Sequence, residues 1–287
     1  MEMSQYEDYQ TTSLDYDSTR VPVGMEIVLG CLGTLEKPLS ELTLLDAGCG
    51  TGNYSQALIS SVGRIEAVDL NPGMIAQAEK KLRAEIDAGR IAFQEASIDS
   101  LPFEDQSFDA VVINQVIHHL EEEGDPGFPR HERVFSEFQR VLKPGGMLLI
   151  NTCSREQIKN GYWYADLLPD ASNRLSRKYI EMDELKALLE QCGLEARDRI
   201  VSLDTVLQGE LYFEPERLLT AECRAGDSTF ALLSEEQLRQ FEADVKGMVD
   251  EGSFSGYFKE RDRLRPTARR PRRDRAAGPG QATEGAD

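Results

Sequence analysis

The chain has 287 residues, 40% of them hydrophobic, so it can bury a sizeable core as one α/β domain with additions or as two small domains. Its net charge is −19, but residues 259–275 carry a net +6, which leaves the rest of the chain near −25 (−19 less +6). Such an acidic body repels phosphate backbones, which disfavours DNA or RNA as a partner.

The chain has five cysteines, an odd number, and no CxxC pair. This indicates free thiols in a reducing compartment rather than a disulfide framework or a zinc site. No apolar run approaches the length of a membrane span, and the acidic start MEMSQYEDYQ is unlike a signal or transit peptide. These features predict a soluble cytoplasmic protein without a metal centre. They leave its oligomeric state open.

The first 35 residues form an N-terminal segment. Residues 1–20 are polar, and apolar side chains recur at helical spacing over residues 21–35. The body of the chain begins after them, at residue 36.

A glycine-rich stretch, Leu42 to Ser55, reads LTLLDAGCGTGNYS. It combines an apolar run that predicts a buried strand, an acid at the strand end, three glycines on alternate positions, and then helical spacing. The acid is Asp46 and the glycines are Gly48, Gly50 and Gly52. Strand, glycine loop and helix form the opening unit of nucleotide-binding α/β domains, where glycine lets the backbone approach a ligand closely.

Two nucleotides are candidate ligands of this loop. A dinucleotide fingerprint is GxGxxG, but this loop is DxGxGxG, with its third glycine one residue early. The acid at the strand end would repel a pyrophosphate and suits an ammonium group. The loop resembles motif I of the class I S-adenosylmethionine (SAM)-dependent methyltransferases, in which it wraps the methionine half of SAM and the acid faces the amino group. The remaining alternative, a glycine turn without a ligand, is disfavoured by the spacing of the later segments.

A second strand is predicted over residues 65–68 and ends at Asp69. An acid at the tip of this strand can accept both ribose hydroxyls. Dehydrogenases also place an acid there, so Asp69 indicates a ribose rather than SAM in particular. Residues 91–94 predict a third strand.

The stretch ASIDSLPF follows, where many related methyltransferases read GDAESLPF and the Asp bonds the adenine amino group. Alignment on LPF places Ser97 at the position of that Asp, and a hydroxyl gives a weaker bond without charge assistance. The resemblance implies that Ile98 packs on one face of the adenine and that Leu70 covers the other.

A fourth strand is predicted over residues 108–113, and Asn114 at its end is expected near the sulfonium. The Asn/Asp-Pro-Pro-Tyr motif of adenine-N6 and glutamine methyltransferases is absent here, which disfavours an amide or exocyclic base nitrogen as the acceptor. His118 and His119 follow. Either imidazole can act as a general base near neutral pH. The alternative is that both begin a helix packed beside the sheet.

An amphipathic helix is predicted over residues 129–142, and a fifth strand over residues 147–151. Between them, RVLKPGGMLLI resembles the signature that follows the motifs of these methyltransferases and that dehydrogenases lack at this position. The chain is therefore identified as a type-11 class I methyltransferase, the group that contains the ubiquinone/menaquinone methyltransferases. The resemblance implies a Rossmann-like, doubly wound, mostly parallel sheet with SAM as co-substrate and a small-molecule methyl acceptor.

Four residues are candidates for binding the acceptor. In small-molecule methyltransferases the N-terminal segment often folds over the cofactor, which suggests Tyr16 and Arg20; a frayed terminus is the alternative. Aromatic residues after the fifth strand often line the acceptor pocket, which suggests Trp163 and Tyr164; a small satellite core is the alternative.

The rest of the chain predicts a helix over residues 183–192, a sixth strand over 194–203, and helices over 214–223 and 234–249. The family's last, antiparallel strand is expected to be missing, because the chain end has almost nothing to bury. The predicted divisions are an N-terminal segment, a SAM-binding domain, a helical extension and a disordered tail: 1–35, 36–203, 204–258 and 259–287.

Other functions remain open at this point. One is a SAM-binding partner or sensor without transferase activity. Another is an NAD-dependent dehydrogenase. A third is arsenite methylation, which needs converging thiols, and Cys153 after the fifth strand is one candidate.

Overall fold

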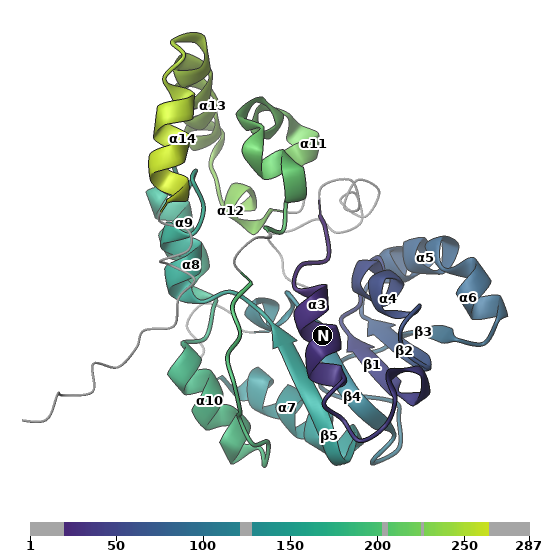
Figure 1. Cartoon of the computed structure of the whole chain (residues 1–287). Helices are drawn as coiled ribbons and strands as arrows, with labels where there is room; N and C mark the ends of the chain where they lie inside the picture. The colour runs from purple at the N-terminus through teal and green to yellow at the C-terminus, as the bar shows by residue number, and fades with distance from the viewer. Residues whose placement is uncertain (1–19, 121–127, 203–205, 225–226, 264–287) are drawn as a thin grey trace, which may run out of the picture.

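The computed structural model describes residues 20–120, 128–202, 206–224 and 227–263. At its centre is a sheet of five parallel strands in the order β3-β2-β1-β4-β5 (Figure 1). The strands are β1 Thr43–Ala47, β2 Arg64–Asp69, β3 Ile91–Glu95, β4 Phe108–Asn114 and β5 Leu142–Asn151. The first five of the six predicted strands are confirmed, and the order reverses between β1 and β4, where open α/β sheets bind ligands.

Helices cover both faces of the sheet because its inner strands are apolar on both sides. Leu44 and Val112 pack in one core with α3 and α4, whereas Leu45 and Val111 pack in another with α7 and α10 (Figure 1). The elements around the sheet are α3 Met25–Leu32, α4 Asn53–Leu58, α5 Pro72–Lys81, α6 Arg83–Asp87, α7 Pro129–Val141, α10 Met182–Gln191, and the 3₁₀ turns Leu39–Glu41 and Ile117–His119.

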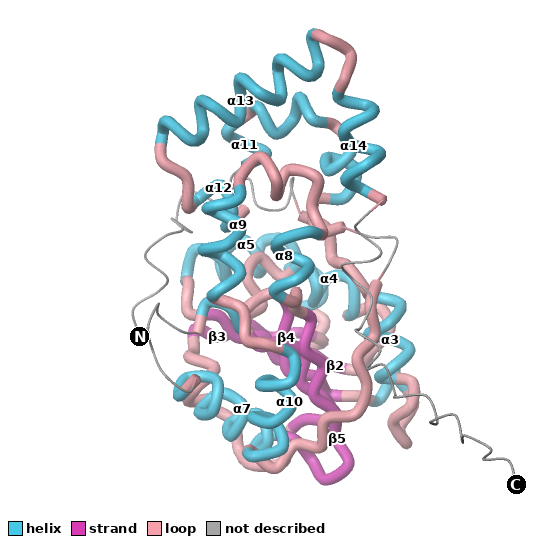
Figure 2. The backbone as a smooth tube through the Cα atoms, turned by 90° about the vertical axis from the view of Figure 1, so that its left-hand side faces the viewer, coloured by secondary structure: helices cyan, strands magenta, loops and turns pink. Residues whose placement is uncertain are grey.

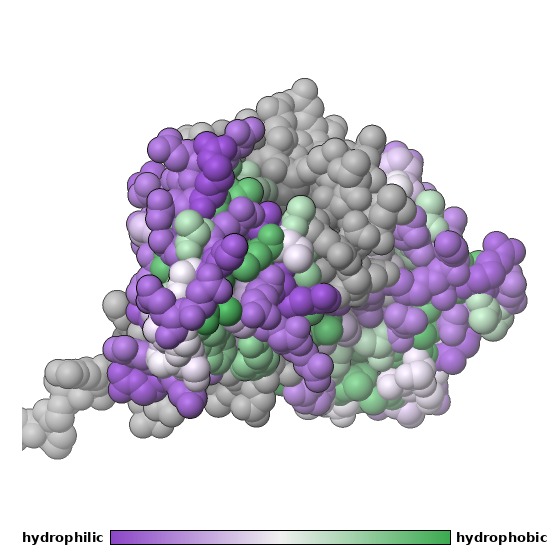
Figure 3. Space-filling model, turned by 90° about the horizontal axis from the view of Figure 1, so that it is seen from above, coloured by the Kyte–Doolittle hydropathy of each residue, from purple (hydrophilic) through white to green (hydrophobic). Residues whose placement is uncertain are grey.

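A helical region lies beyond the carboxyl ends of the strands (Figures 1 and 2). Its elements are α8 Arg155–Asn160, α9 Pro169–Arg177, α11 Ala221–Arg224, α12 Ser228–Ala231, α13 Glu235–Asp250, α14 Phe254–Asp262, and the 3₁₀ turns Gly209–Phe213 and Pro215–Leu219. Its core joins Trp163 and Tyr164 to Tyr212, Phe230 and Phe241. Seen from above, the described surface is largely hydrophilic with apolar residues between (Figure 3).

Two predicted boundaries therefore need correction. Residues 155–180 belong to the helical region, although the predicted extension began only at residue 204. At the other end, α14 continues to Asp262, past the expected start of the tail at residue 259. Residues 264–287, where that tail and any last strand would fall, lie outside the described part of the chain.

The predicted sixth strand is wrong over its described residues, 194–202, which contain no strand. This stretch begins LEARDRI, with charged side chains at successive positions and Ile200 57% exposed. A strand beside β5 would need apolar side chains against the flanking helices. Within the described residues β5 therefore pairs with β4 alone. No helix among the described residues is long and apolar enough to cross a lipid bilayer.

Candidate functional site

A cavity of about 200 Å³, the first cavity, opens where strands β1, β2 and β4 end. Each of these strands contributes one polar side chain from its carboxyl end: Asp46, Asp69 and Asn114. Carboxyl ends of neighbouring parallel strands meet at one edge of the sheet, so these residues come together although 68 positions separate the first from the last.

The glycine loop forms one wall of this cavity. Gly48 has φ +75°, and a Cβ there would lie 2.6 Å from a methyl carbon of Val116, so packing excludes any larger residue. Gly50 has φ +54° and lines the cavity, and no atom lies within 4 Å of its hypothetical Cβ. Gly52 does not line the cavity but stands at the N-terminus of α4, and its contact with a ligand stays a prediction.

Two carboxyl groups line the cavity beside the glycine loop. Asp46 is 1% exposed and accepts a hydrogen bond from the Ser55 hydroxyl at 2.6 Å, and burial raises its pKa to about 6. Asp69 accepts the backbone N–H groups of Gly50 and Asn71, both at 2.8 Å. Burial also raises the pKa of Asp69, although these N–H groups oppose the shift.

The segment between β3 and β4 supplies a third acid, which the sequence reading missed. Leu70 and Ile98 line the cavity as expected, but Ser97 does not. The Ser97 hydroxyl instead donates to the carboxylate of Asp99, and Asp99 lines the cavity. Asp99 lies two positions after Ser97 and is a second candidate for the polar contact expected at Ser97.

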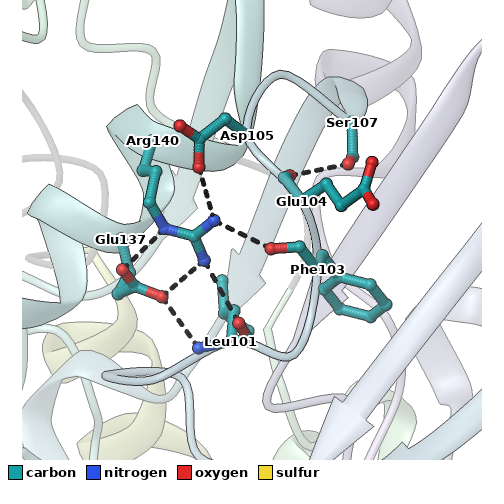
Figure 4. Close-up of polar contacts among 7 residues, drawn as sticks. All are labelled: Leu101, Phe103, Glu104, Asp105, Ser107, Glu137 and Arg140. Atoms are coloured by element: carbon teal, nitrogen blue, oxygen red, sulfur yellow. Dashed lines mark hydrogen bonds and ion pairs between the residues drawn. The ribbon is translucent and has the colours of Figure 1, made fainter.

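Arg140 of α7 holds the loop that follows this acid (Figure 4). Its guanidinium donates to the carbonyls of Leu101 at 3.1 Å and Phe103 at 2.8 Å, and to the carboxylate of Glu137 at 2.8 Å. Glu137 in turn accepts the backbone N–H of Leu101 at 2.8 Å. The loop is thereby fixed to a sheet-packed helix, which also fixes the cavity-lining residues just before it.

Asn114 adds a hydrogen-bond donor. Its side-chain Nδ2 is buried and has no hydrogen-bond partner among the described residues. Buried polar atoms nearly always have a partner, so this one indicates a ligand group that accepts a hydrogen bond. No described residue of β4 or of the glycine loop accepts a hydrogen bond from this Nδ2 atom.

A second cavity of about 60 Å³ adjoins the first on the side of the helical region. The two cavities share four lining residues: Arg20, Gln115, His119 and Leu207. Gln115 has φ +56°, a left-handed conformation that is costly for a non-glycine residue and is typical of functional sites. The strain lies where the cavities meet.

The two predicted histidines are placed differently. His118 lines the second cavity, is 4% exposed and stacks on Tyr179 with ring centroids 4.5 Å apart. Burial holds the pKa of His118 well below its usual value, and neighbouring cationic groups add to this, so the ring is neutral. His119 is half-buried and lines both cavities.

Residues 45–150 match the family model described as "Methyltransferase domain". These residues form a domain of the class I SAM-dependent methyltransferases. The ubiquinone/menaquinone biosynthesis C-methyltransferase UbiE of Escherichia fergusonii is 28% identical over 177 residues, which are 54% of this chain and 67% of that protein. This membership decides against a dehydrogenase and makes SAM the co-substrate.

One further relative and one solved structure are similar to the chain. The biotin biosynthesis bifunctional protein BioHC of Teredinibacter turnerae is 29% identical over 163 residues, covering 53% of this chain but only 26% of that longer protein. A crystal structure of a methyltransferase from an antibiotic biosynthesis pathway of Anabaena variabilis has a TM-score of 0.68 at 24% identity, covering 86% of this chain and 94% of that one. The latter likeness shows the shared fold.

The methyltransferase's predicted acceptor-binding residues fall into three groups. Tyr164 and Arg20 line the second cavity and are 2% and 5% exposed. Trp163 lines neither cavity; it is 0% exposed and donates its indole N–H to the Tyr212 carbonyl at 3.0 Å, so it packs in the core of the helical region. Tyr16 lies outside the described residues.

Proposed function

We propose that this methyltransferase transfers the methyl group of SAM, bound in the first cavity, to a small molecule bound in the second. The observation that carries the proposal is the shared wall of the two cavities, to which His119 and the strained Gln115 belong. A methyl donor and its acceptor must meet in line, and two adjoining cavities supply that arrangement.

We assign the SAM contacts to residues that line the first cavity. Asp46 would hold the ammonium group, Asp69 the ribose hydroxyls, and Asp99 the adenine amino group. Leu70 and Ile98 would cover the adenine faces. Gly48 shapes the loop beside Val116, Gly50 lets it approach the ligand, and Asn114 would donate its free N–H.

When SAM is bound, its sulfonium supplies an activated methyl group. The chain's own residues then have to align the acceptor and exclude water. A base is needed only when the acceptor atom carries a proton, and His119, on the wall between the cavities, is placed for that task.

The alternatives are less well supported. A SAM-binding partner without transferase activity would not need the second cavity. Arsenite needs several thiols, whereas Cys153 alone among the described cysteines lines that cavity. A nucleic-acid acceptor is disfavoured by the net charge of −19. The five free thiols favour action in a reducing compartment such as the cytoplasm.

The test is a transfer assay with methyl-labelled SAM against fractionated cell extract, followed by mass spectrometry of the labelled fraction. We expect one small-molecule fraction to take up label. The Gly50→Val variant should give none, because its side chain fills the SAM cavity. Tight SAM binding without label transfer to any fraction would contradict the proposal and favour a SAM-binding protein without transferase activity.

A further inference from the structure

The second cavity contains two opposite charges that neutralise each other. Arg20 and Asp227 form an ion pair at 3.6 Å, with side chains 4% and 8% exposed, and no other Lys, Arg, Asp or Glu among the described residues lines this cavity. Asp227 also accepts hydrogen bonds from the Tyr164 hydroxyl, the Gln208 amide and the Thr229 backbone N–H, each at 3.0 Å.

The consequence concerns the charge of the ligand. A charged molecule entering this cavity would lose its hydration and find no counter-charge that is still available. Such burial is costly unless the charge is paired. The cavity therefore favours an uncharged molecule.

Gln208 in the cavity wall carries an acceptor atom without a partner among the described residues. Gln208 is 5% exposed, and its Nε2 donates to the Tyr164 hydroxyl at 2.9 Å and to Asp227 at 3.0 Å. These contacts fix the amide, because the flipped orientation would place two oxygens 3.0 Å apart. The Oε1 atom then has no hydrogen-bond partner among the described residues. A buried carbonyl oxygen of this kind calls for a donor.

The walls of the cavity are aromatic. Three tyrosines and two histidines line it: Tyr162, Tyr164, Tyr179, His118 and His119. Flat rings pack best against a flat ligand.

We propose that the second cavity takes an uncharged, planar small molecule that donates a hydrogen bond to Oε1 of Gln208, and that Gln208 selects acceptors of this class. This inference rests on the proposed function, in which the second cavity holds the methyl acceptor. It is narrower than that function, because it specifies the charge and the hydrogen-bonding group of the acceptor.

The test compares four single-ring probes of similar size: phenol, anisole, benzoate and benzylamine. Each is titrated by calorimetry into the full chain saturated with S-adenosylhomocysteine. Phenol should bind at least about tenfold more tightly than the other three, since anisole lacks the donor and the others are charged.

Gln208→Met keeps the length of the side chain but removes its carbonyl, and it should reduce the affinity for phenol to that for anisole. Gln240→Met makes the same exchange at an exposed position of α13 and should change nothing. Binding of S-adenosylhomocysteine by each variant shows that it is folded. If Gln208→Met fails this check, Gln208→Asn, which withdraws the amide by one methylene, should give the same loss.

Three outcomes would overturn the inference: benzoate or benzylamine binding as tightly as phenol, a folded Gln208 variant that keeps the preference for phenol, or no binding of any probe. The titration with S-adenosylhomocysteine alone tests the proposed function separately. Failure there would contradict SAM binding itself, whereas failure with the probes alone contradicts only the assignment of the acceptor class.

Discussion

The carboxylate of Asp69 accepts the backbone N–H of Gly50 at 2.8 Å. The residue assigned to the ribose thus also holds the loop assigned to the methionine half of SAM. Each carboxylate oxygen can accept two hydrogen bonds, so Asp69 can keep this contact and the one from Asn71 while it binds a hydroxyl. Loop position and ribose binding therefore depend on one side chain.

Asp69→Ala should weaken SAM binding by about tenfold or more, because a hydrogen bond to a charged group contributes about 1.5–3 kcal/mol. Isothermal titration calorimetry measures the change. Asp87→Ala removes an exposed acid paired with Arg83 on α6 and is the matched control. An affinity within twofold of wild type in Asp69→Ala would disprove the ribose assignment.

The raised pKa of Asp46 predicts pH-dependent binding. Its folded pKa of about 6 lies above its ordinary 3.8, so the acid is protonated in the ligand-free protein below about pH 6. An ammonium ligand needs the ionised form, so SAM affinity should fall as the pH drops through 6. Titration calorimetry from pH 5 to 8 should show this fall in wild type and a flat profile in Asp46→Asn.

The same shift has a consequence for stability. Because the folded pKa is the higher one, ionisation of Asp46 opposes folding: the cost begins near pH 3.8 and is complete above about 6. Without ligand, Asp46→Asn should therefore gain stability over wild type at pH 7, by up to about 3 kcal/mol. Urea unfolding at pH 4 and at pH 7 measures the difference in unfolding free energy between Asp46→Asn and wild type. An equal difference at both pH values would contradict the raised pKa of Asp46.

Gly50→Val should abolish SAM binding, because the side chain would project into the first cavity. The substitution also strains a residue with φ +54°, so strain needs its own control. Gly145→Val supplies it: Gly145 has φ +77°, with no atom within 4 Å of a Cβ, in the exposed turn at the start of β5. Equal loss of binding in both variants would mean that strain, not filled space, is the cause.

Alanine variants of the two histidines should distinguish a residue that packs in the core from a residue that takes part in catalysis. His118→Ala removes a buried ring stacked on Tyr179 and should cost about 2–4 kcal/mol of unfolding free energy, with SAM affinity kept. His119→Ala should instead lower kcat with a smaller change in melting temperature. Melting curves and steady-state kinetics on both variants decide it. An inactive His118→Ala that melts like wild type would reverse the assignment.

The sheet and the first cavity could be predicted from sequence because both follow from local patterns. Apolar runs define the strands, and residues at the ends of parallel strands must meet, so Asp46, Asp69 and Asn114 were found without a structure. Asp99 was missed because local alignment does not tell which residue of an irregular segment turns inward. The sixth strand failed because residues 194–202 carry too much charge to pack inside a sheet.

The second cavity could be predicted only in part: the sequence named Arg20 and Tyr164 as candidates, but distant segments build the cavity. Tyr164 and Asp227 are 63 residues apart and meet through a hydrogen bond at 3.0 Å, and Arg20 joins them from the N-terminal segment. No periodicity links these positions. Only the packing of the helical region around Trp163 and Phe241 brings them together.

Within the described residues, β5 has β4 as its single neighbour in the sheet. Successive backbone amides of a strand point to opposite sides, so every second N–H of residues 147–151 faces β4 and the others face outward. The two sets should exchange their hydrogens with deuterated water at very different rates, although they share one strand. The N–H groups of β5 that face β4 would thus be protected from exchange like those inside the sheet, whereas the outward N–H groups would exchange like those of a loop.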